Sequence, residues 1–97
     1  KEELIFYVPN AFTPDGDEFN NVWQPIFTSG FDASDYHLSI YNRWGEVVFE
    51  SFNHEVGWDG TYGGKLVADN VFTWVIEFGD INNDERHTVN GHLTILR

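Results

Sequence analysis

Apolar and polar residues alternate along most of the chain with a period of two, which is the spacing of β-strands that bury one face. The clearest case is 71–78, "VFTWVIEF". One face of this segment carries only large apolar side chains: Phe72, Trp74, Ile76 and Phe78. It is therefore predicted to be a central core strand. The same alternation predicts strands at 4–8, 36–42, 46–51 and 86–97.

Glycine and asparagine mark the turns, because both tolerate positive φ. Gly45 predicts a hairpin between 36–42 and 46–51, and "GDINNDE" at 79–85 predicts a second hairpin before the last strand. The long loop between these hairpins is rich in Gly, Asp and Asn, with at most one short strand near 61–66. The pattern predicts an all-β fold: an immunoglobulin-like antiparallel β-sandwich of six to seven strands.

Length and charge narrow the classes of partner. A chain of 97 residues has the size of one domain, and its opening on a strand-like segment suggests a module of a larger protein. Five Lys and Arg against sixteen Asp and Glu give a net charge of −11, which repels nucleic acids and anionic membranes. Basic protein surfaces and divalent cations remain as partners, or the charge serves solubility alone. No Cys is present, and no apolar run is long enough to be a transmembrane segment.

Four segments carry a resemblance to a known family. They are "VPNAFTPDGDEFNN" at 8–21, "IYNRWGEVVFES" at 40–51, "WDGTYGG" at 58–64 and "NGHLTILR" at 90–97. In this order they resemble the gliding-motility-associated C-terminal domain family, the type B sorting domain of the type IX secretion system. The resemblance spans essentially the whole chain.

The resemblance implies that residues 1–97 form a single C-terminal sorting domain of a larger exported protein, such as an adhesin. Components of the type IX translocon would recognise this domain, and an outer-membrane partner would then hold the cargo at the cell surface. The expected location is therefore outside the cell, on the outer membrane. We also expect the domain to be a monomer.

Three residues are predicted to contact the partner. Arg43 and Trp44 of "NRWG" belong to the residue types most often found as interface hot spots. The alternative is structural: Arg43 stacks on a ring or pairs with a carboxylate, and Trp44 covers an end of the sandwich. Arg97 meets either an acidic partner or the domain's own carboxylates.

The acidic turn after the first strand offers oxygen ligands for calcium. The candidate ligands are Asp15, Asp17, Asn20 and Asn21. Relative to the family motif, Glu18 replaces a glycine and Asn21 replaces an aspartate, which weakens the calcium hypothesis. The alternative is a turn whose side chains bond its own backbone amides. A calcium site here would have the weak affinity of extracellular modules, with a Kd of about 10⁻⁴ to 10⁻³ M.

Two other motifs have mainly structural interpretations. In "WDGTYGG" we expect Trp58 in the core, Asp59 bonded to nearby amides and Gly60 in a positive-φ turn. The histidines do not predict a zinc site. His87 and His92 are five residues apart and point to opposite faces of a strand, while His37 and His54 have no nearby ligand at a metal spacing.

No spacing of acids or nucleophiles singles out a catalytic pair, so we do not expect an enzyme. The competing interpretation is a carbohydrate-binding module. Aromatic residues make up 18% of the chain, and exposed rings on a β-sandwich can stack on sugars. The rings of such a platform would come from Trp23, Trp44, Trp58 or Tyr62; the alternative is that these rings pack in the core.

Overall fold

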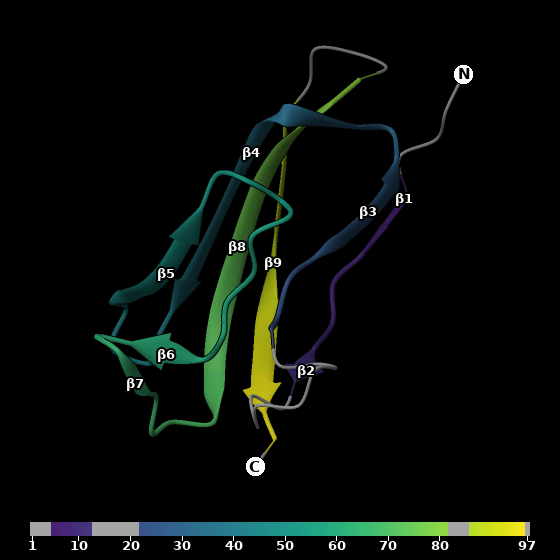
Figure 1. Cartoon of the computed structure of the whole chain (residues 1–97). Coiled ribbons are helices and arrows are strands. Elements are labelled where there is room, and N and C mark those ends of the chain that lie inside the picture. The colour runs from purple at the N-terminus through teal and green to yellow at the C-terminus, as the bar shows by residue number, and fades with distance from the viewer. Residues whose placement is uncertain (1–4, 13–21, 82–85, 97) are drawn as a thin grey trace.

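The computed structural model describes residues 5–12, 22–81 and 86–96, and within these ranges it contains strands and no helix (Figure 1). The strands are β1 (Ile5–Tyr7), β2 (Ala11–Phe12), β3 (Ile26–Ser29), β4 (Phe31–Tyr41), β5 (Val47–Ser51), β6 (Thr61–Tyr62), β7 (Lys65–Leu66), β8 (Val71–Asp80) and β9 (Arg86–Ile95). The main sheet has the order β2-β9-β8-β4-β5, and β1 pairs with β3 in a second layer. The prediction of an all-β, immunoglobulin-like sandwich is confirmed.

The core lies between these two layers, and β8 is its central strand as predicted. Phe72, Trp74, Ile76 and Phe78 are all buried. Phe6 of β1 and Phe27 of β3 pack against Phe78 with ring centroids 5.4 and 5.0 Å apart. The other side of β8 is more exposed, so the period-two pattern correctly identified which face the second layer covers.

The structure departs from the sequence prediction in its short and irregular strands. β4 begins at Phe31 and not at 36, because its pairing with β8 shifts register between Asp32 and Tyr36. Ser34 donates its N–H and its hydroxyl to Asp32 Oδ1, which forms a local turn there and lowers the pKa of Asp32. The prediction of at most one strand near 61–66 is wrong: β6 and β7 form a small hairpin. β2 pairs with β9 in parallel, unlike the antiparallel pairs elsewhere in the described sheets.

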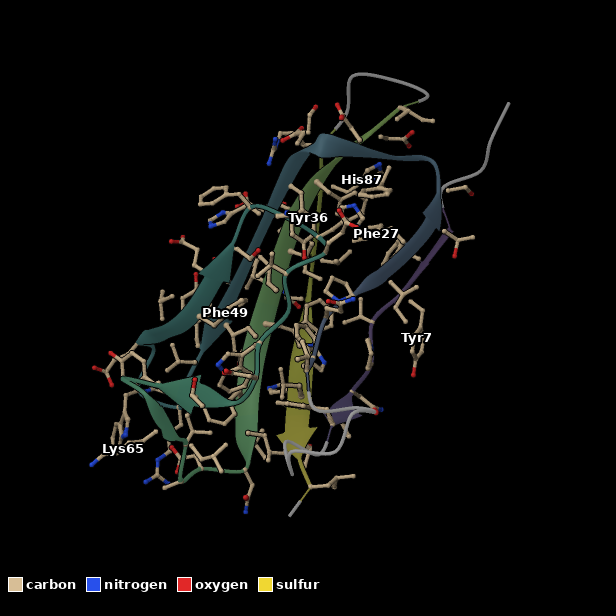
Figure 2. All side chains as sticks on the ribbon, viewed as in Figure 1. Tyr7, Phe27, Tyr36, Phe49, Lys65 and His87 are labelled. Carbon is tan, nitrogen blue, oxygen red and sulfur yellow. The ribbon has the colours of Figure 1, made fainter. Side chains whose placement is uncertain are left out.

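Tyr36 of β4 points into the space between the layers, close to Phe27 (Figure 2). Only 4% of Tyr36 is exposed, and among the described protein atoms its hydroxyl has no hydrogen-bond partner. Burial raises the pKa of this phenol above its ordinary value of 10.0. The hydroxyl therefore carries a desolvation cost that no protein contact offsets.

We expect Tyr36→Phe to stabilise the domain at pH 7 by about 1 kcal/mol, because it removes this buried polar group. Stability of the wild type should fall above pH 10, since the unfolded phenol ionises there while the folded one stays protonated. The variant should lose less stability on going from pH 7 to pH 11. Urea unfolding followed by circular dichroism measures both effects, with Tyr62→Phe as the exposed control. A less stable Tyr36→Phe variant at pH 7 would show that the hydroxyl is satisfied in solution.

Candidate functional site

The described parts of the four segments that carry the family resemblance lie mainly toward one end of the sandwich. Strand register places Tyr41, Thr73 and His92 side by side, so the turn after β4 lies beside the start of β8 and the last third of β9. At the same end, β2 pairs with the last residues of β9, and the β6–β7 hairpin lies below β5 (Figure 1). We call this region, residues 10–12, 42–46, 58–70 and 92–96, the motif end.

Trp58 is a fully buried core residue at the motif end. Its side chain is fully buried and packs against Phe12 and Phe72 at centroid distances of 5.8 and 5.0 Å. Its indole N–H donates to the carbonyl of Thr61 at 2.9 Å. The backbone of Trp58 also exchanges two hydrogen bonds with Trp23, at 2.7 and 2.8 Å. The predicted core position of Trp58 is confirmed.

The residues after Trp58 also have the predicted structural roles. Asp59 Oδ1 accepts the Thr61 N–H at 3.0 Å and the Thr61 hydroxyl at 2.6 Å. Gly60 has φ 85°. The motif "WDGT" therefore shapes the chain that leads into β6.

Gly91 of "NGHL" lies under the indole of Trp74. A Cβ built at this position would lie 2.7 Å from Trp74 Cζ2, closer than side-chain carbons can approach. This glycine therefore makes room for a core ring, which gives the last motif a packing role in addition to any contact outside the domain.

In the "NRWG" turn two residues fix the backbone conformation, and the other two carry exposed side chains. Asn42 Oδ1 accepts the N–H groups of Trp44 and Glu46 at 2.9 and 3.0 Å, and its amide donates to Glu46 Oε1 at 2.9 Å. Gly45 supplies the positive φ of 83° that the turn requires. Asn42 and Gly45 thus fix the backbone, while the side chains of Arg43 and Trp44 are left for outward contacts.

Arg43 and Trp44 lie together on the surface of the turn. The guanidinium carbon of Arg43 is 5.0 Å from the Trp44 ring centroid, and Arg43 Nε is 3.8 Å from Asp69 Oδ2. Arg43 thus makes both contacts of the structural alternative. Trp44 does not cover the sandwich, since 72% of it is exposed. An exposed ion pair of this length contributes less than about 1 kcal/mol, so a partner can replace it.

Two hollows flank the Arg43–Asp69 pair. A hollow of about 170 Å³ lies between Asn42, Tyr62 and Phe72. A larger one of about 470 Å³ lies between Arg43, Asn70 and His92. Ala68 and Asp69 line both, and the exposed Trp44 stands beside them. The arrangement combines an exposed Trp, a cation and adjoining depressions, and Trp and Arg are residue types enriched in interface hot spots.

Two of the three described cations of this acidic domain lie at the motif end. Among the described residues the Lys and Arg side chains are Arg43, Lys65 and Arg86. Arg43 and Lys65 lie at the motif end, where Lys65 projects away from the sandwich (Figure 2). Arg86 lies at the opposite end and pairs with Asp35. Asp69, which sequence reasoning missed, is the partner of Arg43; no sequence pattern links residues 26 positions apart, and only the β4–β8 register brings them together.

Five of the predicted site residues lie outside the described residues: the calcium candidates Asp15, Asp17, Asn20 and Asn21, and the C-terminal Arg97.

The four histidines and the rings offered for sugar binding all lie within the described residues. His87 stacks on Phe78 on the core face, whereas His92 lies on the other face of β9, as predicted. Within the described ranges no three His, Asp or Glu side chains are grouped to hold a metal. Of the rings offered for a sugar platform, Trp23 and Trp58 are buried in the core, whereas Trp44 and Tyr62 are exposed.

A polar cluster on the outer face of the main sheet was also missed. His37 Nε2 lies 2.7 Å from Glu50 Oε2, and its Nδ1 lies 3.4 Å from Glu77 Oε1. The ring of Phe52 stacks on His37 with a centroid distance of 4.5 Å. These residues come from three strand regions, so sequence spacing alone could not identify the cluster.

Comparison with known proteins adds a family and a fold relative. The family model described as CHU_C Type IX secretion signal domain matches residues 6–95. The crystal structure of CopC from Methylosinus trichosporium OB3b is similar in fold, with a TM-score of 0.59 and 12% identity over 95% of this chain and 90% of that chain. At that identity the likeness concerns the fold alone. No curated protein matches the chain. No helix in the described ranges is long and apolar enough to cross a membrane.

Proposed function

The chain belongs to the CHU_C type IX secretion signal domain family, and from this premise we propose that it directs an exported cargo through the type IX translocon by presenting its motif end to the machinery. In this proposal residues 1–97 act as a C-terminal sorting domain of a larger protein. In this proposal the domain acts by binding, and its family is a sorting-signal family.

The observation that carries the proposal is that the motif end contains both residues that stabilise its fold and residues that are exposed. Several of the recognisable residues there are occupied in packing or turn formation, such as Trp58, Asp59 and Asn42. Arg43 and Trp44 differ, because they are held in place yet 67% (side chain) and 72% exposed. A rigid turn that presents Arg and Trp loses little entropy on binding, which favours recognition.

Export of a fluorescent passenger tests this function directly. Residues 1–97 are fused to the C-terminus of the passenger and expressed in a bacterium with type IX secretion and in a translocon-deficient mutant. We expect fluorescence at the surface or in the medium only when the translocon is intact. Passenger that remains in the periplasm of both strains would contradict a sufficient sorting signal.

The finer part of the proposal concerns the end point of export. We propose that an outer-membrane partner retains the domain, and with it an adhesin-like cargo, at the cell surface. The net charge of −11 supports a partner with a basic rim around an acidic site for Arg43. Protease shaving of intact cells separates the two end points, since retained passenger is removed from cells and released passenger is already in the medium.

Calcium binding by the turn that contains Asp15 and Asp17 stays a prediction with a thermal test. A site with a Kd of about 0.5 mM should stabilise the domain by about 1.4 kcal/mol in about 5 mM Ca²⁺. For a domain of this size that raises Tm by roughly 5 °C or more. Differential scanning calorimetry with and without Ca²⁺ measures the shift, with equal Mg²⁺ and the Asp17→Ala variant as controls. An unchanged Tm would rule out the calcium site.

A further inference from the structure

β9 has an edge that is only partly occupied. One side of β9 pairs with β8 along nearly its whole length, from Arg86 to Thr94. The other side pairs with β2 at Thr94 and Ile95 alone. Beyond β2 the chain diverges from β9 toward β1, which joins β3 in the second layer (Figure 1). Among the described strands, none pairs with this side of β9 over 86–93.

The hydrogen-bond pattern identifies the backbone groups on that edge. The N–H of Ile95 donates to Asn70 on the β8 side, whereas the N–H groups of Thr94 and Leu96 donate toward Asn10 and Phe12 on the β2 side. Donors and acceptors alternate between the two sides of an antiparallel strand. On the unoccupied stretch the outward-facing residues are therefore the even-numbered ones: Arg86, Thr88, Asn90 and His92. Within the described part of the chain, the carbonyl of His92 accepts the Trp74 indole N–H at 3.3 Å on this side.

The side chains along 88–92 do not block the addition of another strand at this edge. Exposed edges are usually blocked by charge, proline or a bulge. Apart from Arg86 at its start, which pairs with Asp35, β9 carries no Lys, Arg, Asp or Glu, although the whole domain has a net charge of −11. Its register with β8 is regular. Thr88 and Asn90 are exposed and neutral, while Val89 faces the core and is only partly buried. The edge thus combines free backbone groups with an apolar neighbour for alternate side chains.

We infer that this edge of β9 receives an extended segment of the sorting partner, which adds a strand to the main sheet in line with β2. β2 already occupies the same edge as a parallel strand, so the edge accepts this geometry. His92 also lines the larger hollow beside Arg43, which makes the edge and the motif end one continuous surface. The inference rests on the proposed function for the identity of the partner. A second copy is disfavoured as the occupant because two domains of charge −11 repel.

A peptide probe tests the edge without any secretion machinery. The probe is a lysine-flanked synthetic peptide with three valine–threonine repeats, and the readout is amide hydrogen exchange of the domain by NMR. At a saturating concentration we expect the Thr88 and Asn90 amides to exchange roughly tenfold more slowly, because new backbone bonds protect them. Unchanged exchange at both amides would overturn the inference. Protection that instead grows with domain concentration in the absence of peptide would identify a second copy as the occupant and also overturn it.

Proline variants connect the edge to sorting. Asn90→Pro and Thr88→Pro each remove an outward N–H without breaking the ladder to β8, which edge strands tolerate. The control is Glu50→Pro on the opposite edge strand β5; the same alternation, carried across β8 and β4, turns its N–H away from β4. We expect both β9 variants to stay folded, to lose peptide protection and to reduce passenger export at least about tenfold, unlike Glu50→Pro.

The two measurements separate the two hypotheses. If the wild-type passenger is not exported, the proposed function fails, and the exchange experiment still decides whether the edge accepts a strand. If the peptide protects the edge but folded Asn90→Pro and Thr88→Pro passengers are exported normally, the sorting partner does not use it and the inference is wrong.

Discussion

Trp58→Ala is expected to lower the free energy of unfolding by about 3 to 5 kcal/mol, a large share of the roughly 5 to 15 kcal/mol that stabilises a typical domain. The side chain is fully buried against Phe12 and Phe72, so its loss leaves a cavity at the motif end. It also leaves the Thr61 carbonyl without its indole donor. Urea unfolding followed by far-UV circular dichroism measures the change.

Trp44→Ala is the matched control for this prediction. It removes the same side chain from the same end of the domain, but 72% of Trp44 is exposed. We expect a change within about 0.5 kcal/mol, as for other surface substitutions. Trp58→Phe should fall between the two, at about 1 to 3 kcal/mol, because it keeps a ring but loses the bond to Thr61. A Trp58→Ala variant less than 1 kcal/mol below wild type would contradict the assigned core role.

The parts of the fold that the sequence predicts well are those with strict alternation. In β8 every second residue from Phe72 to Phe78 is buried, and the Gly45 hairpin joins the two strands named for it. The predictions fail where local hydrogen bonds replace the period of two. At Asp32 the side chain captures Ser34, so the start of β4 shows no alternation. β2 is two residues long and is defined by its contacts with β9, which no local pattern can indicate.

The candidate site was predictable in its residue types but not in its surroundings. Arg43 and Trp44 attract attention because of their chemistry, and the structure places both on the surface of one turn. Asp69, which pairs with Arg43, and the neighbouring hollows are brought to this place by the register of three strands. The resemblance identified four segments, and the fold adds that some of their members, such as Trp58 and Gly91, serve packing. The sequence motifs therefore combine residues that stabilise the local fold with residues whose side chains are exposed on the surface.

Arg43→Ala and Trp44→Ala are each expected to reduce translocon-dependent export of the fused passenger at least about tenfold while the domain stays folded. Central Trp and Arg residues of an interface cost about 2 kcal/mol or more when truncated, which exceeds tenfold in affinity. Neither substitution removes a buried contact, since Arg43 makes one long ion pair and one exposed ring contact. Export is measured as surface and medium fluorescence, normalised to the total, and folding by Tm.

The controls remove an aromatic ring and an arginine from other surfaces of the domain. Tyr7→Ala removes a 61% exposed ring from β1, on the second layer (Figure 2), and Arg86→Ala removes an arginine from the opposite end of the domain. Both should be exported like wild type. Arg43→Lys keeps the charge but loses the planar group that stacks on Trp44, so an intermediate defect is expected if stacking orients the ring. Equal export of all these variants would assign Arg43 and Trp44 to structure, and recognition would then have to lie on another surface of the sandwich.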